Sequence, residues 1–217
     1  MISAKTLLRI FILLSILYVS CILFDLATLV FYLKPLLLLP LIFAVFISTS
    51  FKNKIILLAA LVFSWLGDIL LLFVFKDAIY FILGLVAFLT AHIFYIVLFI
   101  KEIKKANGSI QFKNGLTLIA IYLTILLLML IPHLGGLVIP VIIYAVVIST
   151  MLYMAYLLSF YRPKPTSAYL LTGAISFILS DSILAFNKFY HPVPIAGFLI
   201  MVTYLYAQWA LVKSCIK

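Results

Sequence analysis

Two aspartates, Asp68 and Asp181, stand inside long runs of apolar residues. An ionised aspartate at the centre of a membrane-spanning helix costs about 2.5–3.5 kcal/mol on insertion scales, and such residues usually face the interior of a helix bundle. A carboxyl group in an apolar site tends to be protonated, and a second carboxylate nearby favours protonation of one of the two. A protonated acid with an ionised base is the pair that two-carboxylate hydrolysis uses. We therefore predict that both aspartates are catalytic; the alternative is that each only holds helices together through hydrogen bonds.

The surroundings of the two aspartates match. Residues 66–73 and 179–186 both read Leu, a small residue, Asp, then Leu three and Phe five positions after the aspartate. The motifs lie 113 residues apart, on the third and seventh of the spans proposed below. Because an even number of crossings separates them, both helices point the same way across the membrane. This predicts a parallel 4+4 repeat, in which the two carboxyls lie at similar depth and face one cavity.

Six further polar side chains could support the aspartates, and they lie on the same spans, on neighbouring spans or just after them: Ser64, His92, Tyr95, Asn187, Tyr204 and Gln208. Ser64 is one turn before Asp68 and could orient its carboxyl, although serines in spanning helices usually bond to their own backbone. Tyr95 follows His92 at i+3, on a neighbouring face of the same helix. A lone histidine in a helix is as often structural as functional.

Two lysines are candidates for binding a lipid headgroup. Lys34, with Pro35, is expected to cap the outer end of the second helix, and Lys188 follows Asp181 by seven residues, with Asn187 beside it. Ammonium groups bind phosphate as point charges; the alternative is that these lysines only reach towards the interface. No motif of clustered metal ligands occurs, so we predict neither a metal nor another cofactor.

The composition identifies a membrane protein. Of the 217 residues, 68% are hydrophobic and only 9% are charged, and the mean hydropathy is +1.41. Soluble domains have about 45–50% apolar and about 25% charged residues. A water-soluble enzyme, a secreted disulfide scaffold, a disordered chain and a nucleic-acid binder are thereby excluded. Cys21 and Cys215 are expected at opposite faces of the membrane and therefore cannot pair.

A spanning helix needs about 20 mainly apolar residues, and the chain divides into a single all-α domain of about eight of them, with seven as the alternative. The predicted spans are 7–24, 35–51, 55–75, 78–100, 115–131, 135–160, 166–186 and 192–213. The boundary between the first two is the least defined, because residues 26–33 are also apolar.

The loop charges orient these spans. With a cytoplasmic N-terminus, twelve of the fifteen basic residues fall inside the cell: Lys5, Arg9, Lys52, Lys54, Lys101, Lys104, Lys105, Lys113, Arg162, Lys164, Lys213 and Lys217. The outside keeps only Lys34, Lys76 and Lys188. This bias follows the positive-inside rule, so both termini are predicted to be cytoplasmic. The net charge of +10 thus reports topology, with membrane lipids as partners, and not nucleic-acid binding.

Several of these segments together resemble the YhhN-like, or lysoplasmalogenase, family. The resemblance rests on SWLGDILL (64–71), GLVAFLTAHIFY (84–95) and LSDSILAFNKF (179–189), supported by KPL (34–36), Tyr144 and residues 204–208. It extends from about Lys34 to Gln208. It implies an integral-membrane hydrolase, in the cell membrane if the source is bacterial, that cleaves the vinyl-ether bond of lysoplasmalogens. The products would be a fatty aldehyde and glycerophosphoethanolamine or glycerophosphocholine. The oligomeric state and the role of each aspartate stay open.

Two other functions are weighed against the hydrolase. A proton-coupled transporter would also use buried aspartates in a parallel repeat. Transport sites often lie at paired broken helices, however, and the sequence places the clearest interior break at Pro140, away from both aspartates. A purely structural membrane protein would leave the two aspartates without a purpose.

Overall fold

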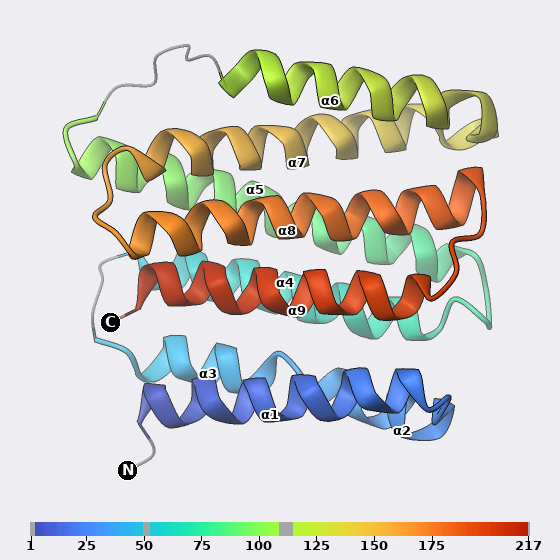
Figure 1. The fold of residues 1–217 in the computed structure, drawn as a ribbon, viewed down its shortest axis with the longest axis horizontal. Helices are drawn as coiled ribbons and strands as arrows, with labels where there is room; N and C mark the ends of the chain where they lie inside the picture. The colour runs from blue at the N-terminus through green and yellow to red at the C-terminus, as the bar shows by residue number, and fades with distance from the viewer. Residues whose placement is uncertain (1–2, 50–52, 109–114, 217) are drawn as a thin grey trace. The chain divides into compact units, whose positions relative to one another are not determined.

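A computed structural model describes residues 3–49, 53–108 and 115–216 of the chain. All secondary structure in these ranges is helical (Figure 1). Eight of the described helices are long and apolar enough to cross a membrane, which confirms the all-α class and the predicted number of spans. Lys52, Lys113 and Lys217, which the charge pattern assigns to the cytoplasm, lie outside the described residues.

Most span ends lie within a few residues of their predicted positions. The spans are Ala4–Leu23, Ala27–Ile47, Lys54–Leu72, Ile79–Lys105, Gly115–His133, Gly135–Ser159, Thr166–Tyr190 and Ala196–Cys215. The second differs most from its prediction of 35–51, because it begins at Ala27 and ends at Ile47. Residues 50–51 of that prediction lie outside the described part of the chain.

Pro35 accounts for the misplaced second span. α2 (Ala27–Leu33) gives way to the 3-10 turn η1 (Lys34–Leu36), and α3 (Leu39–Ile47) begins only afterwards. A proline lacks the N–H of a regular helix and clashes with the preceding turn, so the span is broken where the sequence suggested a new start. Lys34 therefore does not stand at the outer end of the second span as predicted; it caps the C-terminal end of α2 and lies within the span, about 10 Å along the axis from Ala27 at 1.5 Å per residue.

Pro140 does not break its helix, contrary to expectation. α7 (Val138–Ser159) begins only two residues before it, so Pro140 lies in the first turn, where N–H groups have no helical partner in any case. The interior break lies instead at Pro35. The argument against a transporter assumed that no broken helix lies near the aspartates. For the second span this assumption is wrong, because the break at Pro35 lies beside the helix that carries Asp68.

The chain forms two compact units. The N-terminal unit ends at Leu98 and includes Cys215 near the C-terminus. It contains α1 (Ala4–Leu23), α2, η1, α3, α4 (Lys54–Leu72) and the first part of α5 (Ile79–Lys105). α3 packs against both α1 and α4, and η1 also contacts α4. The broken span is thus in direct contact with the helix that carries Asp68.

The C-terminal unit, Phe99–Ser214, places four helices side by side. α6 (Gly115–Leu130), α7, α8 (Thr166–Ala185) and α9 (Ala196–Cys215) follow one another in this order (Figure 1). The short turns η2 (Ile131–His133) and η3 (Gly135–Leu137) join α6 to α7, and the π-helical turn η4 (Phe186–Tyr190) extends α8. Gly173 lets α8 and α9 approach closely, since a Cβ atom there would lie 3.1 Å from Leu211.

The two aspartate-bearing helices end at equivalent positions. α4 ends at Leu72, four residues after Asp68, and α8 ends at Ala185, four residues after Asp181. The 113-residue offset of the motifs therefore also holds for the ends of their helices. The parallel repeat, the single membrane domain and the cytoplasmic termini stay predictions.

Candidate active site

Asp68 lies one turn before the end of α4 and is buried, with 2% of its surface exposed. Its neighbour Gly67 sits against the ring of Phe88 on α5; a Cβ atom on Gly67 would lie 2.6 Å from that ring. One turn further, a Cβ atom on Gly84 would lie 2.7 Å from Leu71. Glycines at both positions thus let α4 and α5 approach each other closely beside Asp68. The close approach fixes the helix that presents the carboxyl.

A tyrosine lies near Asp68 on a third helix. The hydroxyl of Tyr18, on α1, is close enough to Asp68 to interact with its charge, and Tyr18 is buried. A hydroxyl can donate a hydrogen bond to a carboxylate or accept one from a carboxylic acid. Asp68 therefore has a polar neighbour that suits either protonation state.

The broken second span is joined to the Asp68 helix by a hydrogen bond. The indole Nε1–H of Trp65 donates to the carbonyl oxygen of Pro35 at 2.6 Å. Trp65 precedes Asp68 by three residues, so the joint lies within about one helical turn, 5.4 Å along the axis, of Asp68. Lys34 is half-buried at the same break, and it forms no ion pair with any other described residue. The turn that carries Lys34 thus meets α4 within about one helical turn of Asp68.

Asp181 accepts a hydrogen bond from the neighbouring helix in the C-terminal unit. The hydroxyl of Tyr144, on α7, donates to Oδ2 of Asp181 at 2.5 Å. Next to Asp181, the Ser182 hydroxyl donates to the carbonyl oxygen of Ile178 at 2.5 Å and is also bonded to the hydroxyl of Tyr122 on α6. Three helices therefore contribute polar groups around Asp181.

The turn that follows Asp181 is held by Asn187. Its side-chain oxygen accepts a hydrogen bond from the backbone N–H of Val193 at 2.9 Å, which closes the connection from η4 to α9. Tyr190, in the same turn, meets His133 edge-to-face at 5.0 Å between ring centroids. Lys188 is exposed. Of the two residues predicted near a headgroup here, Asn187 holds the turn through its hydrogen bond, and Lys188 is accessible at the surface.

The remaining predicted residues are buried: Ser64, His92, Tyr95, Tyr204 and Gln208. Ser64 is fully buried on α4, but its hydroxyl makes no hydrogen bond with any described residue, so the expected orienting bond to Asp68 does not form. His92 and Tyr95 are fully buried on α5. Tyr204 packs edge-to-face on Phe177 at 5.6 Å. The roles of His92, Tyr95, Tyr204 and Gln208 stay predictions.

Four residues around the aspartates were not given a role by the sequence: Tyr18, Trp65, Tyr122 and Ser182. Trp65 and Ser182 stand inside the two aspartate motifs, so proximity along the chain could have indicated them. The tyrosines had no such signal, because the chain contains 13 tyrosines and helix pairing alone decides which of them meet an aspartate. Tyr144 is marked in the sequence only as one of the residues that support the family resemblance.

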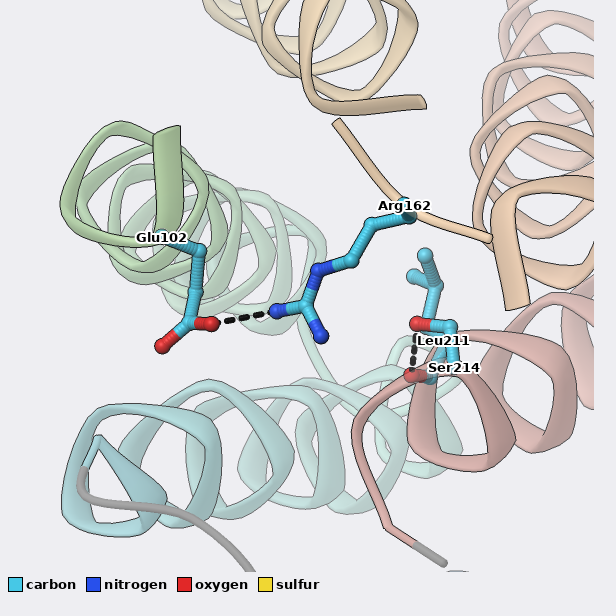
Figure 2. A network of polar contacts seen from close by, with 4 residues as sticks. All are labelled: Glu102, Arg162, Leu211 and Ser214. Atoms are coloured by element: carbon cyan, nitrogen blue, oxygen red, sulfur yellow. Dashed lines mark hydrogen bonds and ion pairs between the residues drawn. The ribbon is translucent and has the colours of Figure 1, made fainter. Parts of the chain in front are cut away.

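Away from the aspartates, one ion pair joins the end of α5 to the loop after α7. Arg162 contacts Glu102, whose side chain is 6% exposed (Figure 2). Nearby, Ser214 donates to the carbonyl oxygen of Leu211 at 2.7 Å near the end of α9. Within the described ranges, no three His, Cys, Asp or Glu side chains gather as a metal site would require.

The model of the YhhN family matches residues 29–215. The chain belongs to the YhhN family. Among curated proteins, this YhhN protein is 32% identical over 167 residues to lysoplasmalogenase TMEM86B of Homo sapiens and 31% identical over 168 residues to that of Mus musculus. It is also 32% identical over 161 residues to human lysoplasmalogenase TMEM86A.

These alignments cover 75%, 75% and 72% of the YhhN chain. They cover 64%, 64% and 63% of the three relatives, so the chain spans somewhat less than two thirds of each relative's length. No solved structure matches it. The family match and the eight apolar spans together identify an integral, multi-pass membrane protein, as the composition predicted.

Proposed function

We propose that this YhhN protein is a lysoplasmalogenase-like hydrolase that cleaves the vinyl-ether bond of lysoplasmalogens. The similarity to proteins named lysoplasmalogenases over about three quarters of the chain supports this activity. The observation that carries the proposal is a pair of intramembrane aspartates, each on a spanning helix of a chain with only five acidic residues. A lysophospholipid substrate would reach both from within the membrane.

Vinyl-ether hydrolysis needs one acid and one base. A carboxylic acid first gives its proton to the alkenyl carbon, which leaves a carboxylate and an oxocarbenium ion. Water then adds to the cation and gives a proton to the second carboxylate, forming a hemiacetal. In the collapse of the hemiacetal, the second group returns that proton to the leaving glycerol oxygen, and the first carboxylate takes the hemiacetal hydroxyl proton. An aldehyde and an alcohol are formed, and both carboxyl groups return to their starting states.

Asp68 and Asp181 are the groups to which we give this work. Buried dipoles stabilise a cationic intermediate most effectively where water is excluded, and burial of Asp68 supports such a setting. Neither step calls for a serine nucleophile. The half-buried Lys34 is proposed to bind the substrate phosphate, since an ammonium group at the break of a span could bind a headgroup drawn into the membrane.

A proton-coupled transporter would use some of the same features. Broken spanning helices are common in transporters, so the break in the second span is compatible with a hydrolase and with a transporter. The relatives named above are lysoplasmalogenases, and none of them favours a transporter. The hydrolase is therefore the function that we put to the test.

The test is aldehyde release from lysoplasmenyl-ethanolamine by the detergent-purified full chain. Asp68→Asn and Asp181→Asn remove one ionisable group each with almost no change of shape. Asp25→Asn is the matched control, because Asp25 lies in the turn after α1 with φ of 54°, a conformation that asparagine also tolerates. We expect wild-type rates from this control and a loss of at least about 100-fold from each of the other two.

Two outcomes would oppose the proposal. Aldehyde release that survives in both folded aspartate variants would show that other residues perform the hydrolysis. If the wild-type protein releases no aldehyde from either ethanolamine or choline lysoplasmalogens, the proposed hydrolase activity is wrong. Proton-flux measurements in liposomes would then be the next experiment.

A further inference from the structure

Ser64 departs from the usual behaviour of hydroxyl groups in spanning helices. Such hydroxyls usually donate to the backbone carbonyl oxygen of the preceding turn. Six of the described residues donate to the carbonyl oxygen four residues before them, at 2.5–2.8 Å: Ser15, Thr90, Thr150, Thr172, Ser182 and Thr203. The Ser64 hydroxyl is fully buried and makes no hydrogen bond with any described residue.

A buried hydroxyl without a partner is costly to the protein. It forfeits about 1–3 kcal/mol of solvation, and most buried polar groups are therefore bonded to the chain or to an ordered water. Neither its own helix nor a described residue of a neighbouring helix satisfies the Ser64 hydroxyl. A small polar ligand would gain a hydrogen bond there for which no other group competes.

Asp68 lies one turn after Ser64 on the same face of α4. Side chains at i and i+4 of a helix have Cβ atoms about 5–6 Å apart. Asp68 is also buried, with 2% of its surface exposed. Two hydrogen bonds of about 2.7–2.8 Å through one water span up to about 5.5 Å, so a single water matches this spacing. A water can accept from Ser64 and bond to either state of a carboxyl, so the match does not depend on the protonation of Asp68.

The carboxyl distinguishes Ser64 from a second serine in the same condition. Ser149, on α7, also has a buried hydroxyl without a hydrogen-bond partner among the described residues. The residue one turn after it is Tyr153, so Ser149 has no acid at the equivalent position. A buried water needs two to four polar partners, and Ser64 with Asp68 supplies two of them from one helix. The Tyr18 hydroxyl adds a polar group near the same carboxyl.

We propose that Ser64 and Asp68 bind a water molecule between them, and that this water is the one consumed by the hydrolysis. The second part rests on the proposed function, whereas the first part does not. Because the hydrocarbon interior of a membrane holds almost no water, a hydrolase with its carboxyl on a spanning helix needs a bound water beside that carboxyl.

Ser64 is a positioning residue in this proposal. One lone pair of the water accepts the Ser64 proton, which leaves the other lone pair for the substrate. In the addition step, the water oxygen forms a bond to the oxocarbenium carbon. One O–H bond of the water breaks, and its proton passes to a carboxylate oxygen of Asp68. Ser64 holds the water and exchanges no proton.

The water site can be tested without substrate. In a crystal structure of the full chain that shows ordered waters, we expect one water about 2.7–3.0 Å from both the Ser64 hydroxyl and a carboxyl oxygen of Asp68. The water should be lost in Ser64→Ala. A Ser64 hydroxyl bonded to the carbonyl oxygen of Ala60, without a water beside Asp68, would overturn the site.

The use of this water is tested by competition with methanol. Methanol can add to the oxocarbenium ion in place of water and then gives a mixed acetal instead of an aldehyde. Ser64→Ala removes the group that holds water and leaves room for a methyl group. At a fixed methanol fraction, we expect the ratio of acetal to aldehyde to rise about 3–10-fold in this variant. We also expect kcat to fall about 5–20-fold, with KM for the lipid within about twofold of wild type.

Ser149→Ala is the matched control, because it removes an unbonded buried hydroxyl that has no carboxyl one turn further on. It should leave kcat, KM and the acetal ratio within about twofold of wild type.

The two measurements separate this proposal from the proposed function. A wild-type structure without a water between Ser64 and Asp68 would overturn the water site, whether or not aldehyde is released. A bound water together with unchanged kcat and acetal ratio in folded Ser64→Ala would overturn its use in the hydrolysis. A wild-type protein that binds the water but releases no aldehyde would remove the hydrolase and keep the water site.

Discussion

Trp65 donates its indole N–H to the carbonyl oxygen of Pro35 at 2.6 Å. The second span is interrupted between α2 and α3, and carbonyl groups at such a break need donors from elsewhere. Trp65 supplies one donor. Because Trp65 stands three residues before Asp68, the bond also fixes Lys34 relative to the carboxyl in the same unit.

Trp65→Phe should raise KM for the substrate while changing kcat little. The variant keeps an aromatic ring but leaves the Pro35 carbonyl without its indole donor, so the turn that carries Lys34 loses an anchor. A hydrogen bond of this kind contributes about 1 kcal/mol, which corresponds to a KM about fivefold higher with kcat nearly unchanged. Steady-state aldehyde release measures both. Trp209→Phe, at a tryptophan that packs against Tyr169 in the other unit, is the control and should leave KM unchanged.

Lys34→Met should remove the preference for a phosphate-bearing substrate. An ammonium group in a partly buried site interacts strongly with phosphate because little water screens it. We expect KM for lysoplasmenyl-ethanolamine to rise about 10–100-fold, while KM for an alkenylglycerol without phosphate changes by less than about twofold. Lys188→Met should have the smaller effect, since Lys188 is exposed. Equal losses on both substrates would assign Lys34 a structural task instead.

The sequence predicted the spans because length and hydropathy alone decide them. It misplaced the start of the second span for a definite reason: Lys34 and Pro35 were interpreted as the end of a loop, whereas they form a break inside an apolar segment. A charged residue beside a proline is typical of both arrangements. The packing of the turn against α4 and the bond from Trp65 show that the break inside the apolar segment is the arrangement adopted.

The site was predictable only where an unusual residue marked it. An aspartate inside a span is rare enough to stand out without a structure. The partners of these aspartates are tyrosines, and a tyrosine on a spanning helix attracts no attention by itself. Which of them meets Asp181 depends on how α7 packs on α8, and this packing has no short-range pattern in the sequence.

Gly67→Ala should destabilise the N-terminal unit although alanine favours helices more than glycine does. The added Cβ atom would lie 2.6 Å from the Phe88 ring, and forcing an extra methyl group into a packed interface costs about 1–3 kcal/mol. Thermal unfolding in detergent should show a lower midpoint. Gly136→Ala is the control, since no atom lies within 4 Å of a Cβ atom there. Adding Phe88→Leu to Gly67→Ala should restore part of the loss; a midpoint unaffected by Gly67→Ala would contradict the close approach.

The predicted orientation can be tested with single cysteines in a chain without Cys21. We expect Cys215 to react with a membrane-impermeant maleimide only after the cells are permeabilised, because the positive-inside pattern places the C-terminus in the cytoplasm. A cysteine at Gly136, in the turn between α6 and α7, should react in intact cells. The reverse pattern would invert the topology and place the aspartates nearer the cytoplasmic surface.

Glu102 and Arg162 should stabilise the protein without taking part in hydrolysis. Glu102 is the more buried partner, with 6% of its side chain exposed against 26% for Arg162, so removal of Arg162 leaves a poorly solvated charge. In a double-mutant cycle of Glu102→Gln and Arg162→Met, we expect a coupling free energy of about 1–3 kcal/mol from reversible unfolding in detergent.

Lys105→Met is the control for this cycle, because Lys105 is an exposed charge in the last turn of α5, the helix that carries Glu102. It should lower the free energy of unfolding by less than about 0.5 kcal/mol. Asp181 lies about 20 Å along α8 from its start at Thr166, by the rise per residue, and Arg162 precedes that start. The folded variants should therefore keep wild-type kcat and KM. A loss of kcat that exceeds the loss of folded protein would show that the ion pair also acts on the site.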